Sequence, residues 1–231
     1  MYRKSENIMN SFFTMSKEER TKRLIMTIGG VLTCGVSVGL YKLAAFGVDP
    51  FQVLLAGCAE LIPLEFGMVS ILLNVVMLLF SFFADRHYIG IATFINLLFF
   101  GYIVQYSLQF FRFCFPNIGI PGRIVCFIIA VVVMCFGSAM YFTSDLGVST
   151  YDAVSLIITN TWHIGKFQYN RIISDCICVI LGVVLLFISG LPWLKIIESA
   201  GIGTIVTAFF MGPLIEFFNV KIARPFLNGK K

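Results

Sequence analysis

The chain has 231 residues, of which 58% are hydrophobic and 13% are charged. A typical soluble domain has roughly 45 to 50% hydrophobic and 25% charged residues, so this composition excludes an ordinary soluble globular protein. Several apolar runs of about 20 residues are long enough to cross roughly 30 Å of hydrocarbon as helices, and the alternation typical of a membrane β-barrel is absent. We therefore expect an all-α, polytopic helical membrane protein whose main partner is the lipid bilayer.

The net charge of +5 is concentrated at the two ends of the chain. By the positive-inside rule, both termini are expected in the cytoplasm, so the number of spans is expected to be even. Juxtamembrane lysine and arginine are the usual flank of a membrane helix, so we expect no nucleic-acid partner. The basic residues are Arg3, Lys4, Lys17, Arg20, Lys22 and Arg23 before the first apolar run, and Lys221, Arg224, Lys230 and Lys231 after the last.

Six long apolar segments are candidates for full spans, which agrees with an even number. Ser16, followed three residues later by Glu19, predicts an N-cap for the first helix. Two further apolar segments, 49–63 and 149–162, have only about 13 to 15 residues and reach roughly 20 Å as helices, which favours re-entrant or broken helices over full crossings. The six candidate spans are residues 24–45, 66–84, 88–111, 123–142, 167–189 and 194–218.

The two halves of the chain share sequence patterns. Phe46 to Phe51 matches Leu146 to Tyr151 with an offset of 100, and Gly90 to Thr93 matches Gly201 to Thr204 with an offset of 111. We therefore divide the chain into a basic cytoplasmic N-terminal segment (1–23), a first membrane repeat (24–112), a second membrane repeat (113–219) and a basic cytoplasmic tail (220–231).

The crossing number decides how the two halves are related. If the short segments do not cross, each half has three spans, and the halves are inverted relative to one another as in many secondary transporters. If they do cross, the chain has eight spans and the repeats are parallel. Helix length favours six spans and an inverted repeat.

Polar residues stand at the start of each short segment. Asp49 with Gln52, and Ser149 with Asp152, have the spacing of an N-cap with its partner at the third helical position. One interpretation is structural, because these side chains would satisfy free backbone N–H groups inside the membrane. The other is functional, because a helix N-terminus is also a partly positive docking point for an anionic or dipolar solute.

The fifth span contains an interior pair of opposite charges, Arg171 and Asp175, four residues apart and so on one face of a helix. An intramembrane carboxylate suggests a proton site, a cation site or a substrate contact. A purely structural ion pair is the equal alternative. Neither the seven cysteines nor the two histidines fall in a metal-binding or catalytic pattern, so we expect no enzyme activity, no cofactor, no metal and no catalytic residue.

Four sequence stretches closely resemble the YczE/YyaS/YitT family of bacterial membrane proteins, and the YczE-like branch in particular. They are the turns at 47–52 and 147–152, the stretch from Asp85 to Asn96, and the stretch from Gly201 to Pro213. The resemblance covers about Leu24 to Phe218 and implies a multi-pass protein of the bacterial inner (cytoplasmic) membrane, without implying a substrate. The resemblance implies a Pro-Trp-Asp or similar triplet at this turn, whereas the first copy here has Pro50, Phe51 and Gln52.

These observations favour a transporter or permease for a small solute. The alternative is a non-transporting accessory or regulatory membrane protein that scaffolds a partner. The sequence leaves the solute, the coupling ion and the formation of a homo-oligomer open. The candidate substrate-binding residues are Asp49, Gln52, Ser149, Asp152, Arg171 and Asp175.

Overall fold

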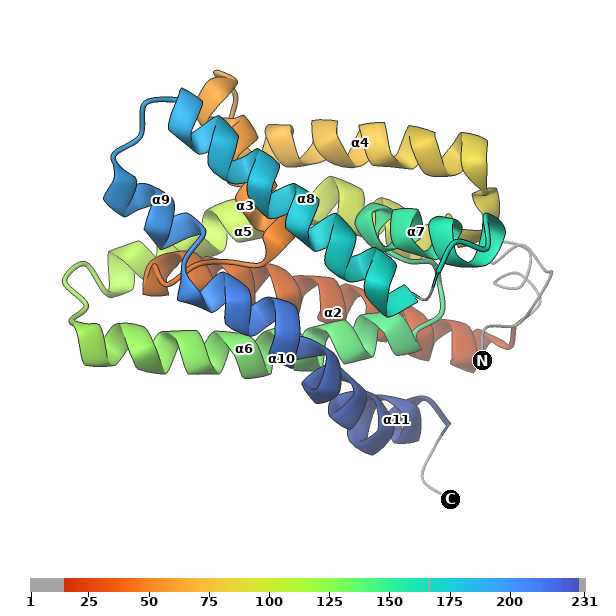
Figure 1. Ribbon diagram of the computed structural model, residues 1–231. Helices are drawn as coiled ribbons and strands as arrows, with labels where there is room; N and C mark the ends of the chain where they lie inside the picture. Colours follow the sequence, from red (N-terminus) through yellow and green to blue (C-terminus); the bar gives the residue numbers. More distant parts are fainter. Residues whose placement is uncertain (1–14, 166, 229–231) are drawn as a thin grey trace.

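The computed structural model describes residues 15–165 and 167–228, and every regular element in these ranges is a helix (Figure 1). The predicted all-α class is confirmed. In chain order the elements are α2 (Lys17–Ala44), α3 (Pro50–Leu61), α4 (Phe66–Ala84), the 3₁₀ turn η1 (Arg86–Tyr88), α5 (Ile91–Cys114), α6 (Ile120–Thr143), α7 (Thr150–Leu156), the π-helix η2 (Ile157–Thr161), α8 (Phe167–Ile188), α9 (Trp193–Ser199), α10 (Ile202–Phe218), the π-helix η3 (Asn219–Ala223) and α11 (Arg224–Asn228).

Six segments in the described part of the chain are long and apolar enough to cross a membrane. They are α2, α4, α5, α6, most of α8, and the segment Trp193–Met211, which runs through α9 into α10. Helix α3 has 12 residues and falls short of this length, as the sequence predicts. The outer faces of the long apolar segments carry large exposed side chains such as Phe83, Phe113 and Phe187. Such side chains suit contact with lipid.

The sixth segment differs from the sequence prediction, because a single helix over 194–218 is wrong. The chain is extended at Gly201, with φ −104° and ψ −161°, between α9 and α10. The physical reason is a close backbone contact: the N–H of Gly203 donates to the carbonyl of Phe46 at 2.6 Å. A Cβ on Gly201 would lie 2.6 Å from that carbonyl oxygen, so the break lets another segment of backbone pack here.

The N-terminal caps of three helices are as predicted. Ser16 accepts a hydrogen bond from the N–H of Glu19, Asp49 from the N–H of Gln52, and Ser149 from the N–H of Asp152. Each bond satisfies one of the N–H groups that lack a partner in the first turn of a helix. Ser149 therefore fixes where α7 begins, and Asp49, with Pro50 in the first turn, fixes where α3 begins.

The long helices α2 and α6 run antiparallel and contact each other along their length. Ser37 donates to the carbonyl of Ala130 at 2.6 Å, and a Cβ on Gly30 would lie 2.8 Å from the carbonyl oxygen of Gly137. An arginine closes each end of this pair. Arg23 donates to the carbonyl of Ser144 at 2.7 Å, and Arg123 to those of Ala44 at 2.7 Å and Ala45 at 3.1 Å.

After α2, and again after α6, the chain leaves the helix and runs extended through a glycine before the next short helix. Gly47 has φ +111° and Gly147 has φ +116°, a region that side chains rarely adopt. Each glycine packs against the start of a distant helix. The neighbouring N–H of Val48 donates to the carbonyl of Ser199 at 3.0 Å, and that of Val148 to the carbonyl of Tyr88 at 3.3 Å.

The two short helices begin next to each other. The rings of Phe51 in α3 and Tyr151 in α7 are stacked, with centroids 4.9 Å apart and an interplanar angle of 16°. Helix α3 then packs on α8, and α7 packs on α4. In Figure 1, α7 runs from the middle of the molecule toward the end where α2 begins. The interior meeting point of α3, α7 and α8 is where polar side chains gather.

Candidate functional site

The guanidinium of Arg171 is the centre of a polar cluster between α7 and α8. Its Nη1 contacts Oδ1 of Asp152, and its Nε lies 3.4 Å from Oδ1 of Asp175. The same guanidinium lies over the ring of Tyr151, 4.3 Å from the centroid. Arg171 is a third exposed, whereas the side chains of Asp152 and Asp175 are only 13% and 12% exposed. One arginine therefore serves two largely buried carboxylates.

Asp175 lies one helical turn beyond Arg171 on α8, inside an apolar span. The phenol of Tyr151 donates a hydrogen bond to Oδ1 of Asp175 at 2.5 Å. A buried carboxylate costs several kcal/mol unless it is paired and hydrogen-bonded, and here Arg171 and Tyr151 supply both. The predicted pairing of Arg171 with Asp175 is confirmed, and it forms part of a larger network.

Asp152 connects this network to the cap of α7. The hydroxyl of Ser149 donates to Oδ2 of Asp152 at 2.6 Å and accepts from the N–H of the same residue at 3.0 Å. In a full capping box, the side chain of Asp152 would return to the backbone N–H of Ser149. It binds the hydroxyl and Arg171 instead. The cap of α7 thus also positions a carboxylate for the cluster.

The start of α3 adjoins the cluster but is satisfied differently. Asp49 accepts through Oδ1 from the N–H of Gln52 at 3.3 Å. Its Oδ2 is buried, as is Oε1 of Gln52, and neither has a hydrogen-bond partner within the described part of the chain. Phe51, stacked on Tyr151, places this turn of α3 beside the charged residues. Asp49 interacts electrostatically with both Arg171 and Asp175.

The structure thus connects four of the six predicted site residues directly: Ser149, Asp152, Arg171 and Asp175. Asp49 and Gln52 form a neighbouring pair. Sequence reasoning missed Tyr151, because an aromatic residue in an apolar stretch normally indicates core packing. One signal was available: Tyr151 matches Phe51 in the two similar turns, and the phenolic oxygen is the difference between them.

A second polar contact ties α7 to α4. Thr150 donates to Oδ1 of Asn74 at 2.5 Å, and the amide of Asn74 donates to the carbonyl of Ser70 at 2.7 Å. Thr150 and Asn74 are 1% and 2% exposed. These groups satisfy one another, so they position the start of α7 without leaving a polar atom for a ligand. Within the described ranges, the structure shows no group of three or more His, Cys, Asp or Glu side chains that could hold a metal ion.

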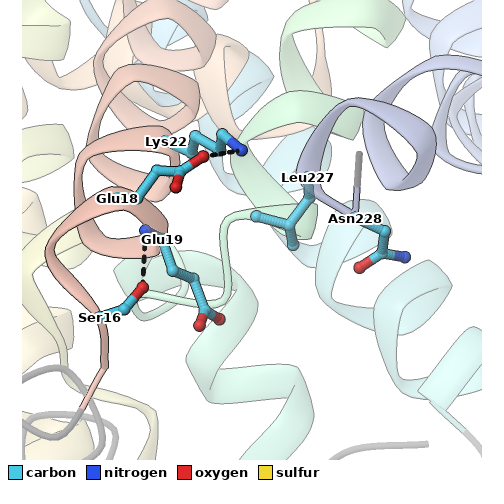
Figure 2. A pocket seen from close by; sticks show the side chains of 6 residues that line it. All are labelled: Ser16, Glu18, Glu19, Lys22, Leu227 and Asn228. Atoms are coloured by element: carbon cyan, nitrogen blue, oxygen red, sulfur yellow. Dashed lines mark hydrogen bonds and ion pairs between the residues drawn. The ribbon is translucent and has the colours of Figure 1, made fainter. Parts of the chain in front are cut away.

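A hollow of about 340 Å³ lies between the start of α2 and α11 (Figure 2). The residues that line it are distant in sequence from this cluster. Figure 2 shows the Ser16 cap and the ion pair between Lys22 and Glu18 on one wall, with Leu227 and Asn228 on the other. The N–H of Glu19 donates to Ser16 at 3.2 Å, and Lys22 lies 2.7 Å from Glu18. Residues from both described ends of the chain line the hollow, so these ends lie at the same end of the molecule. An even number of spans has this consequence.

The chain is similar to three bacterial proteins that are described as uncharacterised, one of them as a membrane protein. It is 24% identical to the uncharacterised protein YyaS of Bacillus subtilis over 87% of this chain and 94% of that protein. It is 24% identical to the uncharacterised membrane protein YczE of the same organism over 87% of each chain, and 25% identical to an uncharacterised protein of Haemophilus influenzae over 82% of this chain and 80% of that one.

No solved structure matches the chain significantly. The resemblance to YczE and YyaS seen in the sequence motifs is confirmed by these comparisons. A family model described as a family of unknown function, DUF6198, matches residues 21–220. This match covers both turns, the charged cluster and the six apolar segments except the first four residues of α2, and the chain belongs to that family.

Proposed function

We propose that this protein is a transporter or permease for a small solute, which binds at the cluster of Asp152, Arg171 and Asp175 without being chemically transformed. The observation that carries the proposal is Asp175, a carboxylate on an apolar span whose side chain is 12% exposed and is held by Arg171 and Tyr151. Stability alone does not require such a network. Replacing buried ion pairs by well-packed apolar side chains is often neutral or stabilising, and intramembrane charges usually mark solute or ion pathways.

The arrangement of the helices supports the proposal. We infer that residues 24–112 and 113–219 are inverted repeats, because corresponding residues of the two halves make reciprocal contacts. Arg23 caps the end of α6, and Arg123, offset by 100, caps the end of α2. Helices α2 and α6 are antiparallel. Many secondary transporters place their solute site where the short, interrupted helices of two inverted halves meet.

The turns after α2 and α6 also make matching contacts, each with the start of a helix in the other half. The N–H of Gly203 donates to the carbonyl of Phe46, and the N–H of Ala92 donates to that of Leu146 at 3.0 Å. Each short helix also packs on a long helix of the other half, α3 on α8 and α7 on α4. If the halves move relative to one another, α3 and α7 move with the opposite half. Rocking of this kind would open the cluster alternately to the two sides.

We propose that the protein resides in the bacterial inner (cytoplasmic) membrane with both termini in the cytoplasm. The six apolar segments and a relative described as a membrane protein support the membrane location. The basic residues at both ends support the orientation. Labelling of single cysteines introduced at the two ends with a membrane-impermeant reagent tests this orientation, and labelling of either end in intact cells would contradict it.

The test of transport uses purified protein in liposomes and a panel of labelled amines, amino acids, sugars and inorganic ions. We expect Asp152→Asn and Asp175→Asn to lose uptake of whichever solute the wild type carries, while remaining folded. Glu60→Gln, which removes an exposed carboxylate from α3, is the control and should keep uptake. If both cluster variants transport as well as the wild type, the assignment of the site is wrong.

An accessory or regulatory role is the second candidate, and the hollow between α2 and α11 is the observation that favours it. It presents Glu18, Glu19 and Lys22 at the end of the molecule where both described ends meet, which suits a contact with a partner protein. Purification from the native membrane distinguishes the roles. A stoichiometric partner that is lost in Lys22→Glu, together with no uptake in liposomes, would favour the accessory role.

A further inference from the structure

Three oxygen atoms are buried without a hydrogen-bond partner among the described residues, two at the start of α3 and one on Tyr41 of α2, which packs in one cluster with Val48 and Val53 and interacts electrostatically with Asp49. They are Oδ2 of Asp49, Oε1 of Gln52 and the phenolic oxygen of Tyr41. Gln52 is 1% exposed and Tyr41 is fully buried. Leaving a buried polar atom unsatisfied is costly, and native structures contain few such atoms. Two of the three sit at the N-cap and the third residue of one helix, so this is a concentrated set and not a scatter.

The chemistry of these atoms selects the kind of ligand. A carboxylate oxygen and an amide oxygen are acceptors only, so they bind a cation or a donor group. Arg171, which interacts electrostatically with Asp49, does not serve an anion, because Asp152 and Asp175 already engage it. An anionic solute would therefore find a guanidinium that is already compensated, and it would face free acceptor oxygens.

The local charge points in the same direction. Asp49 interacts electrostatically with Asp175, Arg171 and Lys42. Three acidic side chains, Asp49, Asp152 and Asp175, thus lie near two basic ones, Arg171 and Lys42. Lys42 does not form an ion pair with Asp49; its ammonium lies over the ring of Phe66, 3.2 Å from the centroid.

The helix dipole opposes a cation here but is too weak to exclude it. The N-terminus of a helix is equivalent to roughly half a positive charge, against the full negative charge of Asp49. The N–H of Gln52 already donates a hydrogen bond to Oδ1 of that carboxylate. Oδ2 therefore remains to bind the ligand.

We propose that Tyr41, Asp49 and Gln52 form a binding site for a small monovalent cation, either an inorganic ion such as Na⁺ or an ammonium group. This inference rests on the proposed transport function, and it makes the cation either the coupling ion or the charged group of the solute. The sequence interpretation of this helix start was a docking point for an anionic or dipolar solute. The proposal favours the dipolar alternative, because the unpaired atoms are acceptors that bind a cation or an ammonium group.

The experiment measures binding without transport. The thermal unfolding midpoint of the purified protein in nanodiscs is followed while NaCl, KCl or methylammonium chloride replaces choline chloride at constant ionic strength. A ligand that binds only the folded state raises the midpoint with its concentration. We expect Na⁺ or methylammonium to do so, and the one that acts at lower concentration identifies the source of the charge.

Three variants locate the site. Asp49→Asn keeps an equally good N-cap but removes the charge, and we expect the cation affinity to fall about tenfold or more. Gln52→Met fills a similar volume without the unpaired oxygen and should also weaken the cation response, which provides a second readout if Asp49→Asn folds poorly. Glu60→Gln, on the same helix but exposed, should respond as the wild type does.

The outcomes separate this inference from the transport proposal. An unchanged cation response in both Asp49→Asn and Gln52→Met, or no response to any of the three cations, would overturn the site. Uptake of an anionic solute that depends on Asp175 but is equally fast in NaCl, KCl and choline chloride would do the same while leaving transport intact, because the cation would then be neither the coupling ion nor part of the solute. Cation binding that depends on Asp49, without uptake of any solute, would support the site and contradict transport.

Discussion

Removing Arg171 tests whether the cluster is held together as the structure shows. Arg171→Met keeps the length of the aliphatic stem but leaves the carboxylates of Asp152 and Asp175 without their cation. Breaking a buried ion pair by removing one partner costs about 3 to 5 kcal/mol. Because the Arg171 side chain is a third exposed, we expect the lower end, about 3 kcal/mol. For soluble domains of similar size this corresponds to a drop in the melting temperature of roughly 6 to 12 °C.

A double-mutant cycle isolates the interaction from general disturbance. The variants are Arg171→Met, Asp152→Asn and their combination, and the free energy of unfolding is measured in mixed micelles with a denaturing detergent. We expect Asp152→Asn to restore at least about 1 kcal/mol to the Arg171→Met protein, since it removes one uncompensated charge. Lys22→Met, which breaks an exposed ion pair with Glu18, is the control and should change stability little.

Two results would refute this reasoning. One is a loss below about 1 kcal/mol in Arg171→Met, which would mean that water or another group compensates the carboxylates. The other is additivity of the two substitutions, which would mean that Arg171 and Asp152 do not interact in the folded protein.

Three further substitutions test individual features of the fold, each by the same unfolding measurement. Gln52→Met, measured in choline chloride without Na⁺, K⁺ or methylammonium, removes a buried acceptor that then has no partner and should raise stability by about 1 to 3 kcal/mol; a loss would mean that Oε1 is satisfied within the protein. Gly147→Ala forces a side chain into a residue with φ +116° and within 2.8 Å of the backbone of Gly90, so we expect roughly 1 to 3 kcal/mol of strain or more. Gly29→Ala, with open space around it, should cost nothing, and equal effects of the two would contradict the contact. Arg123→Met removes the donor to the carbonyls of Ala44 and Ala45 and should cost about 2 kcal/mol, with no loss counting against that contact.

The sequence predicted the architecture well because the lengths of apolar runs are set by the bilayer. Four of the six long helices lie within three residues of the predicted spans at both ends, and α2 begins seven residues before its span, at the predicted Ser16 cap. The break at Gly201 was not predictable from periodicity, since its cause is the carbonyl of Phe46, a contact between segments far apart in the chain. The matched turns at Gly47 and Gly147, by contrast, could be predicted from the sequence, because a glycine before a helix cap indicates a tight turn. Both glycines have positive φ.

The candidate site was predicted in part for a similar reason. Arg171 and Asp175 are four residues apart on one helix, so their pairing follows from local geometry. The contact between Arg171 and Asp152 joins two helices, and no local pattern indicates it. The partners of Asp175 and the unpaired oxygens of Asp49 and Gln52 likewise depend on how α3, α7 and α8 pack. Arg23 and Arg123 were a missed signal, because their offset of 100 matches that of the turns.

The most direct test of a functional cluster is a protein that lacks its charges and still folds. The triple variant Arg171→Met, Asp152→Asn, Asp175→Asn removes one cation and two carboxylates together, so no buried charge of this network is left uncompensated. Uptake by this variant in liposomes is compared with uptake by the wild type for every solute that the wild type carries. We predict a folded protein with near-native stability and no uptake, whereas uptake at the wild-type rate would show that the cluster only holds α7 and α8 together.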